Sequence, residues 1–171
     1  AQPALNVPDD IMRLGEPCLF WGVTGGSIDS MVANYTASLK KRRHDDYTPG
    51  GINDRRPDRA VIVYTNLIRQ YFKKTKPIVL GGIEASLRRI AHYDYWSDSI
   101  RRSILFDAKA DFITYGMSER AILELAESLQ KGSDYRDIRG ICYIAPHKPE
   151  NTLELPSYEK VRDNPKTFTR M

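Results

Sequence analysis

Residues 81 to 103, with the sequence GGIEASLRRIAHYDYWSDSIRRS, combine side chains that are typical of binding sites. Two glycines open the stretch, and four arginines, one histidine, two tyrosines and one tryptophan follow. Flat aromatic rings next to cations can stack on bases and hold phosphates. We therefore take these residues as candidate contacts for a substrate or partner: Arg88, Arg89, His92, Tyr93, Tyr95 and Trp96.

A structural interpretation of the same stretch stays open. The rings can form a small core under a long connection, with the arginines paired to Asp94, Asp98 and Asp107. Charged side chains that are partly buried usually find such partners. The sequence alone does not decide between a contact site and a structural loop.

Glycine-bearing turns follow three apolar runs, in the segments FWGVTGGS, VLGGIEAS and TYGMSER. Open α/β sheets bind ligands beyond the carboxyl ends of their strands, and glycine allows a backbone to approach a ligand closely. We expect the three turns to share one edge and to form a single crevice. The candidate cofactor-binding residues there are Thr24, Gly25, Gly26, Gly81, Gly82, Glu84, Ser86, Gly116, Ser118 and Glu119.

Several kinds of chemistry are not indicated by any motif. The sequence contains no P-loop, no G-x-G-x-x-G fingerprint and no G-x-S-x-G nucleophile elbow. The three histidines are isolated, and neither cysteine belongs to a C-x-x-C pair, so we assign no metal ligand and no catalytic residue to this chain. Cys18 and Cys142 lie in apolar runs, which predicts buried reduced thiols and a cytoplasmic location.

The composition fits one globular domain with a core of its own. The chain has 171 residues, of which 41% are hydrophobic and 28% are charged, and no apolar run is long enough to cross a bilayer. Its net charge of +4 is weaker than that of a dedicated nucleic-acid binder. The basic residues are clustered, however, at 40–43 and again at Arg55, Arg56 and Arg59.

The apolar pattern predicts an α/β fold, a Rossmann-like, doubly wound and mainly parallel sheet with helices on both faces. Continuous apolar runs, typical of strands that are buried on both faces, occur at 18–23, 78–80, 112–115 and 141–145. Helical spacing occurs at 28–39, 59–74 and 119–131. The β-branched AVIVYT within 59–74 could also form a strand, but the length of the segment favours a helix. Ser97 is placed to cap a further short helix, in which Ile100, Ile104, Leu105 and Ala108 face inward.

Two segments lie outside this alternation of strands and helices. Residues 42–58 are polar and glycine-rich, and we interpret them as a long surface excursion. We expect residues 1–145 to form the domain, shortened at its N-terminus, and residues 146–171 to form a linker or arm.

Several long segments of the sequence resemble one known family. FWGVTGGSIDSMVANYTASLKKRRHDDYTPGG, GGIEASLRRIAHYDYWSDSIRRSIL and LPSYEKV look like the YgiQ-type radical SAM proteins, an uncharacterised bacterial family, over about residues 1–165. The resemblance implies an N-terminal accessory region whose parent enzyme uses S-adenosylmethionine and a four-iron four-sulfur cluster. The cluster motif C-x-x-x-C-x-x-C would lie in a core beyond Met171, which makes that core and an unknown substrate the implied partners.

In the wider class of such enzymes, the accessory region looks like a cobalamin-binding-type Rossmann domain. Gly81, Gly82 and Ser86 match the turn near the nucleotide tail of the corrinoid. Gly116 and Glu119 match a second turn, from which Met117 and Ser118 depart. The resemblance thus makes a corrinoid a candidate ligand, although the sequence contains no recognisable cobalt-ligating histidine motif.

The sequence is compatible with three functions. The first is an accessory domain that shapes or closes the active site of a radical SAM enzyme of unknown substrate. The second is an RNA-binding module, in which residues 40–43 and the arginines contact phosphates while Tyr93, Tyr95 and Trp96 stack on bases. The third is a structural one, in which the arginine-rich loop docks the missing core.

Overall fold

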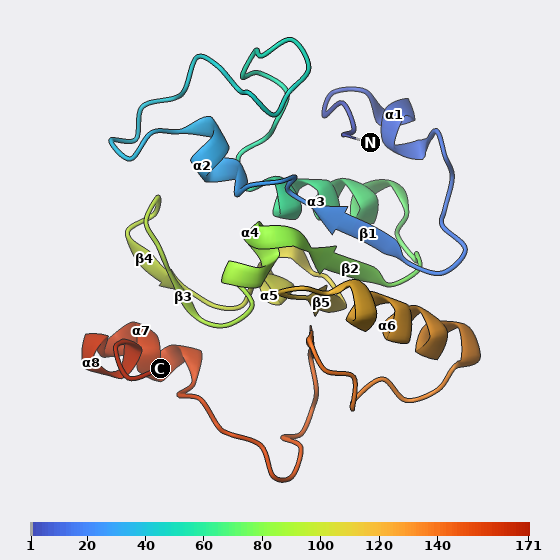
Figure 1. The fold of residues 1–171 in the computed structure, drawn as a ribbon, viewed down its shortest axis with the longest axis vertical. Helices are drawn as coiled ribbons and strands as arrows, with labels where there is room; N and C mark the ends of the chain where they lie inside the picture. Colours follow the sequence, from blue (N-terminus) through green and yellow to red (C-terminus); the bar gives the residue numbers. More distant parts are fainter. Residues whose placement is uncertain (1) are drawn as a thin grey trace.

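The computed structural model describes residues 2–171, which build a four-stranded mixed sheet flanked by helices (Figure 1). Neighbouring strands follow the order β1-β2-β5-β6, in which the first three are parallel and β6 is antiparallel to β5. The predicted Rossmann-like, mainly parallel α/β fold is confirmed. The strands are β1 (Trp21–Thr24), β2 (Ile78–Gly81), β5 (Phe112–Thr114) and β6 (Ile141–Tyr143).

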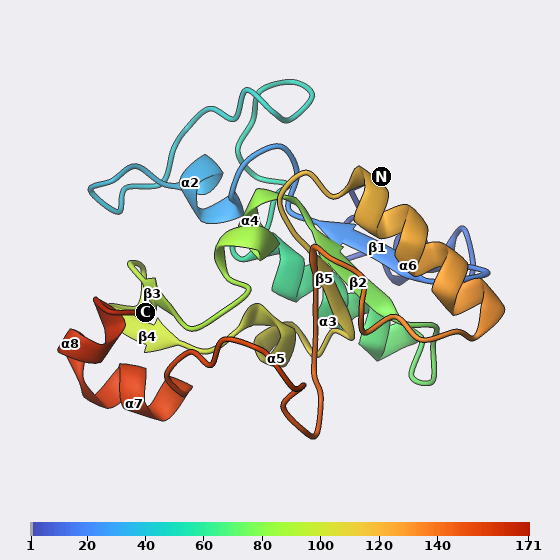
Figure 2. The ribbon, with the colours of Figure 1, turned by 60° about the horizontal axis from the view of Figure 1, so that its bottom comes forward.

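Helices cover both faces of the sheet, as predicted. Figure 2 shows α6 (Glu119–Lys131) on one side of the strands and α3 (Ala60–Tyr71) and α5 (Ile104–Ala108) on the other. Successive side chains of a strand point to opposite faces. Leu80 therefore joins the core under α3 and α5, whereas Val79 packs with Leu125 of α6.

Two long helices were predicted within a few residues of their observed bounds. In α3, the stripe of Val61, Tyr64 and Ile68 is buried against the sheet, so the helical spacing outweighed the β-branched composition. α6 ends at Gly132, whose left-handed φ of +66° lets its N–H bond to the carbonyl of Ser128. Strong periodicity with clear ends is what made both helices predictable.

The helix predicted over 28–39 is wrong in extent. Only α2 (Ser30–Asn34) forms, and Asp29 caps it by accepting the N–H groups of Met31 and Val32. The chain then turns, since the N–H of Thr36 donates to the carbonyl of Lys40 at 2.9 Å. Leu39, the last residue of the predicted apolar stripe, is 52% exposed. The apolar spacing beyond Asn34 is therefore a coincidence and does not mark a buried helix face.

The further short helix is confirmed at Ile104, Leu105 and Ala108, which are buried in α5 (Ile104–Ala108), but the prediction that it begins at Ser97 is wrong. Residues 92–101 instead form an antiparallel hairpin of β3 (His92–Asp94) and β4 (Ser99–Arg101). Ser97 donates its hydroxyl to the carboxylate of Asp94, which closes the turn. α5 begins three residues after β4 and is capped by Ser103, whose hydroxyl accepts the N–H of Leu105.

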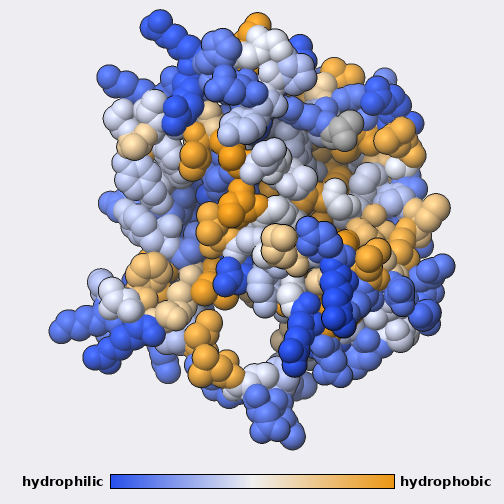
Figure 3. All heavy atoms as spheres, viewed as in Figure 1, coloured by the Kyte–Doolittle hydropathy of each residue, from blue (hydrophilic) through white to orange (hydrophobic). Residues whose placement is uncertain are grey.

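Four short helices were not predicted, because each has only one or two turns and little periodicity: α1 (Pro8–Met12), α4 (Gly82–Leu87), α7 (Tyr158–Asp163) and α8 (Pro165–Phe168). Residues 146–157 loop away from the body and leave an opening that is visible in Figure 3. α7 then returns to the hairpin, where the hydroxyl of Tyr158 donates to the carbonyl of Ile100 at 3.4 Å. None of the helices within residues 2–171 has the length and apolarity needed to span a membrane.

Candidate functional site

The three glycine-bearing corners lie at one edge of the sheet. Thr24 at the end of β1 is paired with Gly81 at the end of β2, and β5 runs in the same direction next to β2. The corner after β5 is tied to the corner after β2, since the N–H of Gly116 donates to the hydroxyl of Ser86 at 3.4 Å. We call this carboxyl edge, from residues 24–27 through 81–87 to 115–119, the rim.

Two glycines of the rim are needed for contacts between the corners. A Cβ on Gly82 would lie 2.5 Å from Oγ1 of Thr24, and a Cβ on Gly25 would lie 2.4 Å from Oε2 of Glu84. Real Cβ atoms do not approach other atoms so closely in packed interiors. Packing thus accounts for these two glycines without a ligand.

Glu84, a predicted cofactor contact, is a structural carboxylate. Its side chain is buried, and Oε2 accepts the N–H of Ser30 at 3.0 Å while Oε1 accepts the N–H of Val61 at 3.3 Å. Ser30 in turn accepts the N–H of Ala60 at 3.0 Å through its hydroxyl. One buried acid therefore joins α4 to the first turns of α2 and α3, where unpaired N–H groups need acceptors.

The two arginines that follow α4 also have partners within the domain. Arg88 forms an ion pair with Asp29 and donates to the carbonyl of Glu84 at 3.2 Å. Arg89 donates to the carbonyl of Ser86 at 2.6 Å, and its guanidinium lies 4.9 Å from the ring of Tyr115. Both side chains therefore hold the rim together.

His92 is the first residue of β3, and its side chain is partly buried. Its Nδ1 is 3.1 Å from the carbonyl of Ile90, and its buried Nε2 has no hydrogen-bond partner among residues 2–171. Burial lowers the pKa of His92, because the charged imidazolium is disfavoured away from water. A neutral, enclosed ring is the result.

Asp94 is the buried centre of the hairpin. Arg59 contacts its carboxylate at 2.7 Å and Arg101 at 3.8 Å, and Arg101 also pairs with Asp107 at 2.7 Å. Burial by itself would raise the pKa of Asp94, but the hydroxyl of Ser97 and the two arginines outweigh burial, so the pKa is lowered. These pairs match the structural interpretation of residues 81–103.

The aromatic residues of this hairpin are only partly free. Tyr95 donates its hydroxyl to the carbonyl of Ala37 at 2.6 Å, and the ring of Trp96 lies 5.3 Å from that of Tyr35. Tyr93 donates to Asp98 at 2.7 Å. The rings of Tyr93 and Tyr95 are still about half exposed, so they are available as contacts on this side.

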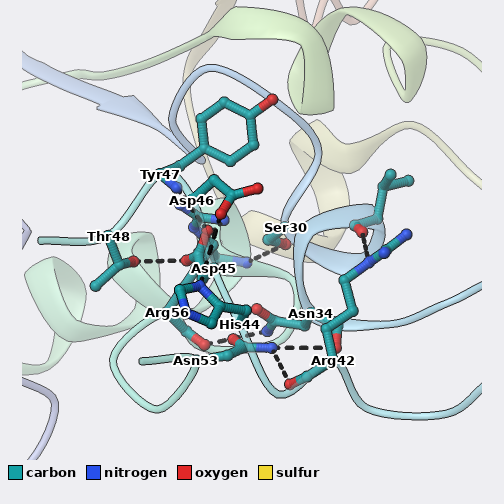
Figure 4. A network of polar contacts seen from close by, with 12 residues as sticks. Ser30, Asn34, Arg42, His44, Asp45, Asp46, Tyr47, Thr48, Asn53 and Arg56 are labelled. Atoms are coloured by element: carbon teal, nitrogen blue, oxygen red, sulfur yellow. Dashed lines mark hydrogen bonds and ion pairs between the residues drawn. The ribbon is translucent and has the colours of Figure 1, made fainter. Parts of the chain in front are cut away.

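The segment 42–58 contains a buried polar network that the sequence analysis missed (Figure 4). It has no helix or strand, as predicted, but Asp45 and Arg56 form an ion pair at 3.3 Å with side chains only 1% and 7% exposed. The amide of Asn53 donates to the carbonyls of Asn34 and Arg42. The interpretation as a surface excursion is therefore incomplete, because the base of the segment is anchored.

Asp45 stays ionised within this network. Burial would raise its pKa, but the hydroxyl of Thr48, the N–H of Tyr47 and the charge of Arg56 together lower it. The acids and arginines that alternate in HDDYTPGGINDRRPD were the available signal for such pairing.

An open groove of about 560 Å³ lies beside β1. It includes the corner that follows β1, but not the corners that follow β2 and β5. α3 contributes Tyr64 and Ile68 to it, and the segment around α1 contributes Ile11 and Leu14. Arg56 and Tyr47 lie at the end next to Thr24, Gly25 and Gly26. Thr24, Gly25 and Gly26 are thus the predicted cofactor-binding residues that line this groove.

Residues 2–171 contain no group of three or more His, Cys, Asp or Glu side chains that could hold a metal ion. Cys18 is exposed, which corrects the prediction of a buried thiol, because β1 begins three residues later than expected. Cys142 is half-buried, and burial raises its pKa. Residues 24–27, 81–87 and 115–119 of the rim include no histidine that could ligate cobalt, and corrinoid binding stays a prediction of the resemblance.

The fold and the rim define a Rossmann-like α/β domain, a class in which the carboxyl edge of the sheet is the functional side. Over residues 1–171 the chain matches the family described as Radical SAM N-terminal, and it belongs to that family. No solved structure matches it.

Curated relatives carry the name UPF0313 protein. The chain is 58% identical to UPF0313 protein FN0734 of Fusobacterium nucleatum over 161 residues, which cover 94% of this chain and 28% of the relative. It is 57% identical to the UPF0313 protein of Thermotoga maritima over 171 residues, which cover 98% of this chain and 30% of the relative. The chain thus spans less than a third of the length of these relatives.

Proposed function

We propose that this chain is the accessory domain of a radical SAM enzyme, and that its rim meets the cluster-bearing core and closes the substrate side of the active site. The family and the resemblance support this proposal. The iron–sulfur cluster and S-adenosylmethionine would be held by residues outside this chain. The free thiols Cys18 and Cys142 are compatible with a cytoplasmic enzyme.

Exposed apolar side chains on the rim are the main support for this proposal. Ile83 and Leu87 of α4 are 44% and 59% exposed, and Met117 at the third corner is 90% exposed. Figure 3 shows apolar side chains in the middle of this face, over α4. Apolar patches on a surface indicate contact with another protein surface more than with a small polar ligand.

The RNA-binding alternative has less support, because several of its arginines are paired within the domain. Three of the arginines that would contact phosphates are paired with acids: Arg88 with Asp29, Arg101 with Asp107, and Arg56 with Asp45. The basic residues at 40–43, Arg55 and Arg102 are exposed. Binding RNA through the paired arginines would require these partly buried pairs to break, which is costly.

Methionine oxidation of the full-length protein tests the docking. By its exposure in this chain, Met117 (90%) should be oxidised faster than Met12 (38%), and Met31 (6%) should be oxidised slowest. If the rim meets the core, we expect the rate at Met117 to fall below that at Met12. Peptide mass spectrometry after limited peroxide treatment measures all three rates in one sample, so Met12 and Met31 serve as internal controls. A rate at Met117 above that at Met12 would refute the docking.

Reductive cleavage of S-adenosylmethionine tests the enzymatic part. The anaerobically reconstituted full-length protein should form methionine and 5′-deoxyadenosine with dithionite as electron donor. Met117→Asp should slow this reaction, because a charge would enter the docked rim. Phe106→Asp on α5 is the matched control, since Phe106 is 46% exposed and lies off the rim. Equal rates for the two variants would count against a role of the rim.

A further inference from the structure

The outer edge of β1 has unpaired main-chain groups. β1 pairs with β2 only, and the N–H of Trp21 donates to the carbonyl of Pro77 at 2.8 Å. Because main-chain groups alternate in direction along a strand, those of Trp21 and Val23 face β2, and those of Gly22 and Thr24 face outward. Within residues 2–171, no hydrogen bond to another main-chain group is found for the N–H of either outward residue.

The groove of about 560 Å³ runs along this edge and is lined by all four residues of β1. Its volume is within the range of about 300–1,000 Å³ that ligand pockets span. Tyr64 and Ile68 line it from α3, and Ile11 and Leu14 line it from the segment around α1. A main-chain edge beside apolar walls is the arrangement that accepts an added strand.

The charges of the groove are balanced. Asp10 and Arg13 lie 3.7 Å apart, and the charge of Arg56 is offset by Asp45 at 3.3 Å. The buried Nη1 of Arg56 nevertheless lacks a hydrogen-bond acceptor among residues 2–171. A neutral carbonyl suits such a donor better than a free anion, because an anion would also meet the carboxylate of Asp45.

We infer that an extended, largely apolar segment from another part of the full-length polypeptide adds to the outer edge of β1 and fills this groove. Curated relatives are more than three times as long as the part matched here, since it covers 28% and 30% of their length. A segment of the same polypeptide binds without the entropy cost of bringing two molecules together. Folded proteins rarely leave such an edge bare, because it promotes aggregation. The added strand lies along the side of β1, whereas rim docking meets the carboxyl end of the sheet, so Gly22, which is outside the rim, reports the added strand alone.

Residue-resolved hydrogen exchange of the full-length protein tests this inference. The amides of Gly22 and Thr24 should be protected to within about tenfold of Val23, the internal control whose N–H faces β2 in either case. Exchange of Gly22 and Thr24 a hundredfold or more faster than that of Val23 would refute the added strand. Protection that disappears on dilution would indicate edge pairing between two copies, which also overturns the inference.

A proline variant separates strand addition from burial by other means. Gly22→Pro removes only an outward N–H, so pairing with β2 is retained. We expect the amide of Thr24 to exchange at least tenfold faster in the variant, while that of Val23 is unchanged. Unchanged protection at Thr24 would rule out a paired strand. The oxidation rate of Met117 reports rim docking separately, so failure of one proposal is distinguishable from failure of the other.

Discussion

Glu84 illustrates how one side chain can look like a ligand contact and act as a structural anchor. It follows two glycines at the end of a parallel strand, where a polar side chain is expected to meet a ligand. The structure turns its carboxylate inward to two backbone N–H groups, on Ser30 and Val61. The same residue type and position are therefore compatible with both roles, and only the side-chain direction separates them.

Gly25→Ala tests this residue-scale account. The new Cβ would meet Oε2 of Glu84 at 2.4 Å and push the carboxylate off its two N–H donors. We expect a loss of about 1–3 kcal/mol in the free energy of unfolding, as for other overpacked sites. Urea unfolding followed by tryptophan fluorescence measures it. Gly81→Ala is the control, because its Cβ would make an ordinary contact of 3.5 Å with Thr114. Equal losses in both variants would contradict the account.

The hairpin of β3 and β4 is the element that depends most on buried charge. Three residues in length per strand, it is too short to be stable by pairing alone. Asp94 connects the hairpin to Arg59 at the start of α3. Within the hairpin, Asp94 of β3 also pairs with Arg101 of β4. The ion pairs thus fix an element that periodicity did not reveal.

The pH dependence of stability follows from the lowered pKa of Asp94. Because the folded pKa lies below the unfolded value of about 3.9, the carboxylate stabilises the fold above that pH. The contribution is lost as the pH falls through the folded pKa. We expect Asp94→Asn to lower the free energy of unfolding by about 1–3 kcal/mol at pH 7. The variant should also lose less stability than wild type below pH 4, as measured by urea unfolding at each pH.

Asp98→Asn is the matched control in the same hairpin. Asp98 is exposed, and its φ of +46° is a conformation that asparagine tolerates. This variant should keep both the stability at pH 7 and the acid sensitivity of the wild type. If it behaved like Asp94→Asn, the effect would belong to the turn and not to the buried pair.

At the scale of the whole molecule, part of the positive charge is committed to internal pairs. The net charge of +4 is modest, and it was the clustering of basic residues, at 40–43 and at Arg55, Arg56, Arg88, Arg89, Arg101 and Arg102, that suggested a surface for nucleic acid. In the structure, four arginines contact buried or partly buried acids, namely Arg56, Arg59, Arg88 and Arg101. A polyanion would therefore meet the exposed basic residues at 40–43, Arg55 and Arg102, and not these paired arginines.

Binding of single-stranded RNA measures this directly. We expect a dissociation constant weaker than about 1 µM at physiological salt, within the range of non-specific binding. Fluorescence anisotropy with a labelled oligonucleotide at two salt concentrations gives both affinity and salt dependence. Nanomolar binding with a steep salt dependence would restore the RNA-binding hypothesis.

Local sequence was sufficient for much of the fold. Continuous apolar runs at 78–80 and 112–115 predicted buried parallel strands, and the helices α3 and α6 followed from 3.6-residue spacing with clear ends. Glycines at the strand ends correctly marked the corners of the rim. These features depend on residues within one or two turns of each other, so a sequence pattern records them.

Only the tertiary structure decided what the corners and charges do. Glu84 contacts residues 54 positions earlier and 23 positions earlier, and Asp94 pairs with Arg59 across 35 positions. The sequence names these acids and arginines but not their partners, because pairing depends on which elements the fold brings together. Side-chain direction, inward for Glu84 and outward for Met117, likewise follows from packing of distant elements and not from local spacing.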